Sequence, residues 1–119
     1  MKTLLVATAA VLLTAGLAPA RTSEEERIVE INKKAFEPAR LEIKVGEKVT
    51  WKNHDLTEHT VTSRAKAARP DAQGKPLFDS GLLKPGETFS FTFVKEGTYE
   101  YVCTIHPGMA GTIGVTPAK

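Results

Sequence analysis

The stretch Thr88-Phe89-Ser90-Phe91-Thr92-Phe93-Val94 alternates phenylalanine with small polar residues, so that every phenylalanine has the same parity. Because successive side chains of a β-strand point to opposite faces, this pattern predicts a strand with one buried face. Arg40–Val45 has the same period, with Leu41, Ile43 and Val45 between charged residues. Both segments indicate a fold that is built from half-buried strands.

Similar patterns recur along the chain, and turn residues separate them at Gly46, Pro85-Gly86 and Gly97. Short strands at such spacing, with almost no helical periodicity, predict an all-β sandwich or barrel of about eight strands. Between them, 64–75 lacks large apolar residues, so we expect an exposed excursion there, with a short helix at 65–68. The further strands that we expect are 27–36, 48–53, 59–63, 98–103 and 111–116, with 78–81 returning the chain to the sheet.

The N-terminal residues have the features of an export signal. Lys2 gives a basic start, an apolar run follows, and Ala18-Pro19-Ala20 offers a small-residue cleavage pattern. Threonine and glycine dilute the run, which disfavours a transmembrane anchor, and no other apolar run approaches the ~20 residues of a span. We expect a signal peptide at 1–20, a flexible lead-in at 21–27 and one domain at 28–119. The protein would then be exported, and periplasmic if its source is a Gram-negative bacterium.

The charge balance argues against nucleic acid as a partner. The chain has a formal net charge of +2. Lys2 is the one charged residue of 1–20, so cleavage leaves the mature chain nearly neutral, and no basic block occurs in it. Arg64, Lys66 and Arg69 give the excursion a locally basic surface, which either is merely solvated or steers an acidic partner.

Cys103 is the only cysteine, so an exported chain cannot use it for an internal disulfide. It begins the segment Cys103-Thr104-Ile105-His106-Pro107-Gly108-Met109, in which a thiol, an imidazole and a thioether recur at every third position. An inert core residue, a nucleophile, an intermolecular disulfide and a metal ligand are the alternatives for this thiol. The neighbouring donors favour the metal ligand.

A fourth donor must come from elsewhere, and His54 and His59 are the candidates. His54 lies in a polar loop, whereas His59 begins a strand-like run that can aim it at the interior. Zinc sites rarely use a thioether, and calcium prefers oxygen ligands, but two imidazoles, a thiolate and a weak axial thioether suit copper. The candidate copper ligands are therefore His59, Cys103, His106 and Met109.

These motifs resemble those of the cupredoxins, the small type 1 blue copper proteins of the amicyanin and plastocyanin kind. The resemblance rests on the ordered combination of Val49-Thr50-Trp51-Lys52-Asn53, His59-Thr60-Val61, Leu83-Lys84-Pro85-Gly86 and the segment from Gly97 to Met109. It implies a Greek-key β-sandwich with copper near one end, two histidines and the cysteine as strong ligands, and the methionine as the axial one. Thr60 departs from the asparagine that many relatives have after the first histidine, where that side chain helps to join the ligand loops.

The ligand set and the resemblance together imply an electron carrier. Four protein donors leave no obvious open position on the metal, which argues against an enzyme. We expect a monomer that meets transient redox partners near His106. The alternatives are a copper chaperone or storage protein with the same ligands, a cysteine hydrolase and a metal-free adhesion module. The hydrolase lacks a nucleophile signature, and the adhesion module leaves the Cys, His and Met spacing unexplained.

Overall fold

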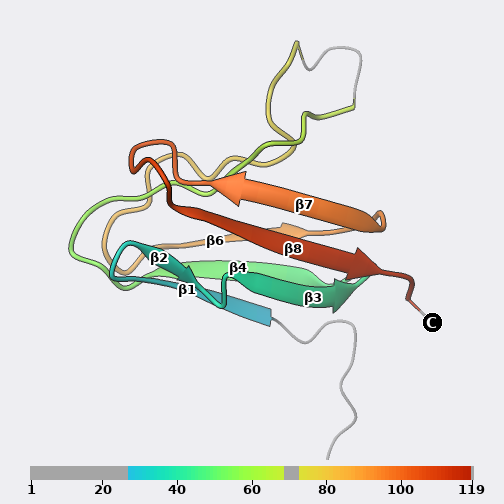
Figure 1. Ribbon diagram of the computed structural model, residues 1–119, viewed down its shortest axis with the longest axis horizontal. Coiled ribbons are helices and arrows are strands. Elements are labelled where there is room, and N and C mark those ends of the chain that lie inside the picture. Colours follow the sequence, from blue (N-terminus) through green and yellow to red (C-terminus); the bar gives the residue numbers. More distant parts are fainter. Residues whose placement is uncertain (1–26, 69–72, 119) are drawn as a thin grey trace, which may run out of the picture.

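The computed structural model describes residues 27–68 and 73–118. The predicted signal peptide at 1–20 lies outside them. The described residues form two packed β-sheets, as Figure 1 shows, which confirms the all-β sandwich. They include no helix that is long and apolar enough for a membrane span.

Each sheet has four strands. The first has the order β2-β1-β4-β6, and the second the order β3-β8-β7-β5. Strands β1 and β4 are parallel, as are β3 and β8, while the other neighbours are antiparallel. The strands are β1 (Arg27–Asn32), β2 (Ala35–Glu37), β3 (Arg40–Lys44), β4 (Lys48–Asn53), β5 (Thr62–Ser63), β6 (Thr88–Thr92), β7 (Gly97–Val102) and β8 (Ala110–Thr116).

The alternating residues of the sequence form the core between the sheets. Trp51 of β4 is fully buried, and its indole ring lies 5.4 Å from the ring of Tyr101 on β7. The phenylalanines of β6 and its C-terminal extension face inward as predicted, and Phe78 packs 4.8 Å from Phe91. Phe78 thus returns the chain to the sandwich, as expected.

Three local predictions were wrong. The single strand expected at 27–36 is a hairpin of β1 and β2, because the chain reverses at Lys33-Lys34, a pair that gives no usual turn signal. The strand expected at 59–63 is reduced to β5, and His59 instead forms an isolated bridge with Leu83.

The helix expected at 65–68 is not formed either. The described parts of this excursion, 64–68 and 73–75, belong to two arms that project from the sandwich in Figure 1. The N–H of Ala67 donates to the carbonyl of Lys75 at 2.9 Å, and the N–H of Leu77 donates to the carbonyl of Ala65 at 2.8 Å. Pairing between the arms satisfies the backbone groups that a helix would have paired internally.

Candidate metal centre

The loop between β7 and β8 carries three of the predicted donors. Val102 pairs with Ala110, so the two strands hold both ends of the loop together. Within the loop, the N–H of Cys103 donates to the carbonyl of Met109 at 3.0 Å, and the N–H of Met109 donates to that of His106 at 3.1 Å. These bonds fold the segment into a compact turn, and they explain why donors at every third position come close together.

His59 reaches the same end of the sandwich from the other side of the core. Its N–H and carbonyl pair with those of Leu83 at 3.1 and 2.7 Å. The buried Asn53 side chain strengthens this arrangement, because its Nδ2 donates to the carbonyls of Thr57 and Leu83 at 2.9 and 3.0 Å. The imidazole of His59 is fully buried and fixed in place.

Three of the predicted ligand side chains converge. Sγ of Cys103 lies 3.4 Å from Nδ1 of His106 and 3.8 Å from Nδ1 of His59. One donor atom from each of the three residues lies within 4.8 Å of the others. Cys103 and His59 are buried, and His106 is half-buried. Met109, at the end of the loop, is 5% exposed. A thiolate and two imidazoles at this separation, with a thioether in the same loop, form a donor set that fits copper.

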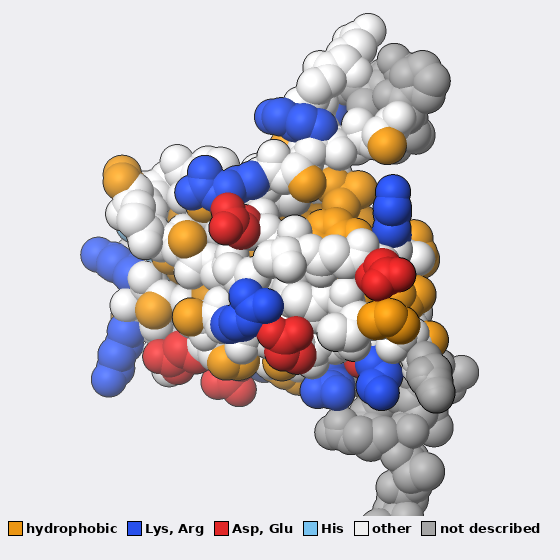
Figure 2. Space-filling model, turned by 45° about the vertical axis from the view of Figure 1, so that its right-hand side comes forward, with side chains coloured by type: hydrophobic (Ala, Val, Ile, Leu, Met, Phe, Trp, Pro, Cys, Tyr) orange, Lys and Arg blue, Asp and Glu red, His pale blue; other side chains and the backbone are white. Residues whose placement is uncertain are grey.

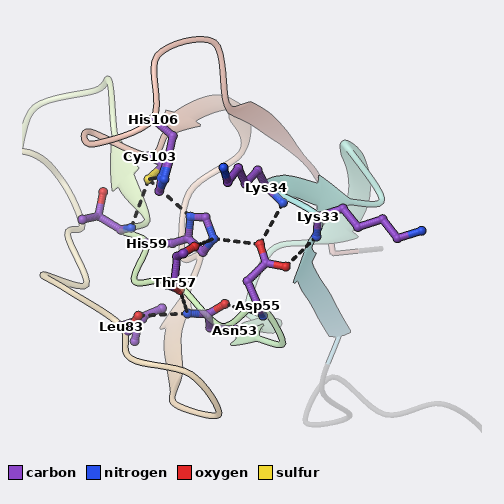
Figure 3. Close-up of polar contacts among 10 residues, drawn as sticks. Lys33, Lys34, Asn53, Asp55, Thr57, His59, Leu83, Cys103 and His106 are labelled. Atoms are coloured by element: carbon purple, nitrogen blue, oxygen red, sulfur yellow. Dashed lines mark hydrogen bonds and ion pairs between the residues drawn. The ribbon is translucent and has the colours of Figure 1, made fainter.

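Asp55 is a functional residue that the sequence reasoning missed. Its Oδ2 accepts a hydrogen bond from Nε2 of His59 at 2.8 Å, on the side of the ring opposite Cys103 (Figure 3). The backbone N–H groups of Lys33 and Lys34 also donate to this carboxylate, at 2.7 and 2.8 Å. Burial raises the pKa of Asp55, but these N–H groups and His59 lower it more, so the net pKa lies below its usual value. Asp55 leaves Nδ1 of His59 free for a metal.

The sequence contained one signal for Asp55. Histidines that bind a metal usually donate a hydrogen bond from their second ring nitrogen to a carboxylate or carbonyl, and Asp55 lies four positions before the candidate ligand His59. The sequence could not distinguish Asp55 from Glu58, which is even nearer to His59 in the chain. Only the fold of the 53–59 loop makes this choice.

Thr60 joins the two ligand-bearing segments. Its Oγ1 accepts a hydrogen bond from the N–H of Thr104 at 2.8 Å, and its own N–H points at Sγ of Cys103 at 3.3 Å. The hydroxyls of Thr60 and Thr104 lie 3.2 Å apart. The departure from asparagine therefore keeps a direct side-chain connection between the loops.

His54 is not part of the centre. Its side chain is 38% exposed, and its Nε2 lies 3.8 Å from Oε1 of Glu30 on the outer face of β1. Of the two candidate histidines, His59 is therefore the one that lies with Cys103 and His106.

Comparisons with known proteins agree with this geometry. The family model described as copper binding proteins, plastocyanin/azurin family, matches residues 24–116. Amicyanin of Paracoccus denitrificans is 34% identical over 98 residues, which cover 82% of this chain and 71% of that protein. Plastocyanin of Solanum crispum is 39% identical over 83 residues, which cover 67% of this chain and 83% of that protein.

The chain is also similar to solved structures of copper proteins. An amicyanin variant in its reduced Cu(I) form has a TM-score of 0.66 and 32% identity, with 79% of this chain and 85% of that chain covered. A purple cupredoxin from Nitrosopumilus maritimus has a TM-score of 0.63 and 34% identity, with 76% of this chain and 99% of that chain covered.

Proposed function

We propose that this chain, which belongs to the plastocyanin/azurin family of copper-binding proteins, holds one copper ion in a type 1 site and carries single electrons with it. The ligands in this proposal are His59, Cys103, His106 and Met109. The observation that carries the assignment is the convergence of one thiol and two imidazole nitrogens within 4.8 Å of one another. Bound there, copper supplies a one-electron couple between Cu(I) and Cu(II).

The side chains around the site favour rapid electron exchange because they limit movement of the ligands. Asp55 fixes the ring of His59, and Asn53 fixes its backbone through the carbonyl of Leu83. The N–H of Thr60 donates to Sγ of Cys103, which stabilises negative charge on the sulfur. A donor set that is held in one arrangement suits both oxidation states and supports a carrier over an enzyme.

Partners would approach through His106, which is the least buried of the three converging donors. Three large apolar side chains are exposed on segments next to the site: Leu56 at 92%, Leu82 at 54% and Ile105 at 46%. Ile105 precedes His106, Leu82 precedes the bridge partner of His59, and Leu56 follows Asp55. We call these three residues the apolar rim. Redox encounters usually bury under ~1,200 Å², so the rim suits a transient partner of a monomeric carrier.

The cellular setting belongs to the same proposal. Residues 1–20 would direct export and be removed after Ala20, so that the mature chain begins at Arg21. In a Gram-negative bacterium this places the carrier in the periplasm. Intact mass measurement of the secreted protein tests the cleavage site, and a mass that retains residues 1–20 would contradict it.

The copper assignment is tested by adding Cu(II) to the purified mature protein. An intense blue thiolate-to-copper colour should appear, ascorbate should bleach it, and Cys103→Ser should lack it. A colourless protein with one tightly bound zinc would contradict the assignment. Labile copper without a stable colour would instead assign the chain to copper delivery or storage.

A further inference from the structure

The hairpin between β1 and β2 turns through only Lys33 and Lys34, because Asn32 pairs directly with Ala35. Both lysines have positive φ angles, of 54° and 58°. Two-residue turns of this kind favour Asn-Gly, since most other side chains are strained at positive φ. The stability of the hairpin therefore does not explain why two lysines occupy it, and such strain is often found where function requires a residue.

This turn is attached to the metal centre through one carboxylate. Asp55 accepts hydrogen bonds from the N–H groups of both lysines, and the same side chain accepts one from Nε2 of His59. The turn is thus two hydrogen bonds away from a ligand imidazole. Figure 3 shows Lys33 and Lys34 on the same side of His59 as Asp55.

The ammonium groups of the turn are available to a partner. Both side chains are exposed, and neither forms an ion pair with another residue in 27–68 or 73–118. In contrast, Nε of Arg64 at the base of the excursion lies 3.7 Å from Oε1 of Glu100. Figure 2 shows positive side chains that project from the left side of the molecule, the side on which Figure 1 draws the β7–β8 loop and the turn between β1 and β2.

We propose that Lys33 and Lys34 are a docking point for an acidic redox protein, whose carboxylates contact this turn while its apolar centre covers the rim beside His106. The inference rests on the proposed electron-transfer function. The whole chain has a formal net charge of only +2, so the attraction arises from where the charges lie and not from their sum. Leu56 of the apolar rim directly follows Asp55, the residue whose carboxylate holds the basic turn.

The test compares two double variants of equal net charge. K33Q/K34Q removes the turn charges, and K44Q/K95Q removes two exposed charges at the opposite end. Lys44 pairs with Thr116 at the end of β8 that is remote from the ligand loop, and Lys95 lies in the turn before Gly97, which pairs with Val115. Stopped-flow mixing measures reduction of the copper-loaded protein by an acidic plant-type ferredoxin and by a basic cytochrome c.

At an ionic strength of about 0.01 M, K33Q/K34Q should slow the reaction with ferredoxin about tenfold and flatten its salt dependence, while K44Q/K95Q should change it less than about twofold. The reaction with the basic cytochrome c should not slow in either variant. Equal rates for the two double variants in a blue, reducible protein would overturn the docking inference alone. A colourless wild-type protein would instead overturn the proposed function.

Binding of a small anion tests the turn without electron transfer. The paramagnetic anion hexacyanochromate(III) should broaden the amide NMR signals of residues 32–35 and 55–57 in the reduced protein more than those of 44–47. Broadening that is centred on the excursion would overturn the inference.

The variant K33N/K34G separates the stability of the turn from its charge. Without copper it should unfold at a higher temperature than the wild type, and with copper it should lose the rapid reaction with ferredoxin. Binding to phosphatidylglycerol vesicles that K33Q/K34Q abolishes would assign the turn to a lipid surface and overturn the protein partner.

Discussion

Asp55 and His59 form a hydrogen bond of 2.8 Å between Oδ2 and Nε2, and this bond turns the other nitrogen of the imidazole toward Cys103. The contact joins the β1–β2 hairpin to the metal centre, because the same carboxylate holds the backbone of Lys33 and Lys34. We therefore expect two roles for Asp55, in positioning a proposed copper ligand and in stabilising a strained turn.

Replacing Asp55 should affect both roles. We expect Asp55→Ala to weaken copper binding about 10- to 100-fold, because the ring of His59 loses the partner that orients it. Competition titration with a chelator of known affinity measures this change. Asp79→Ala is a matched control, since Asp79 also accepts a backbone N–H, that of Gly81, but touches no proposed ligand. Equal copper affinity in wild type and Asp55→Ala would contradict the positioning role.

Thr60→Ala should lower the free energy of unfolding of the copper-free protein by about 1–2 kcal/mol, because the N–H of Thr104 loses its acceptor. Thr60→Ser keeps the hydroxyl and should remain close to wild type. Urea denaturation followed by tryptophan fluorescence compares the three proteins. If serine and alanine destabilise the protein equally, the methyl group of Thr60, and not its hydroxyl, joins the loops.

Two glycines of β8 should respond differently to the same substitution. A Cβ at Gly111 would collide with the buried ring of Tyr101, whereas one at Gly114 would meet the carboxylate end of the exposed Glu42 side chain. A side chain at the surface can move away, but a ring in the core cannot. We expect Gly111→Ala to cost about 1–3 kcal/mol of unfolding free energy and Gly114→Ala less than about 1 kcal/mol. Thermal unfolding of both variants checks the order, and the reverse order would contradict this packing.

Stability should fall in strongly alkaline solution through one phenol. Burial raises the pKa of Tyr101 to about 12. Its pKa in the unfolded chain is about 10, so between these two values the folded state keeps a proton that the unfolded state has lost. The stabilising contribution is complete below pH ~10 and declines by about 1.4 kcal/mol per pH unit up to ~12. Urea denaturation of the copper-free protein across this range measures the slope.

Tyr101→Phe should remove this part of the slope. The substitution should cost little at neutral pH, because the hydroxyl of Tyr101 is buried without a hydrogen-bond partner among the described residues. An unchanged alkaline slope in Tyr101→Phe would show that other groups cause the loss of stability.

The fold class and the candidate copper ligands could both be predicted from the sequence. Alternation in 88–94 and 40–45 needs only the period of a strand, and a thiol, an imidazole and a thioether within the seven residues 103–109 need only a local turn to approach one another. The resemblance to cupredoxins added the Greek-key sandwich, and His59 was the one histidine with a strand-like setting. These features are local in the chain, so sequence reasoning could reach them.

Contacts between distant segments could not be predicted from the sequence. Lys33 and Lys34 carry no turn signal, yet the chain reverses there because Asp55, more than twenty residues later in the sequence, accepts both of their N–H groups. The same long-range contact selects Asp55 over Glu58 as the partner of His59, and another lets the hydroxyl of Thr60 reach the N–H of Thr104. Neither the period of a strand nor the identity of a residue encodes which loop will lie against which. That choice is made by hydrogen bonds between loops that the two sheets bring to the same end of the sandwich.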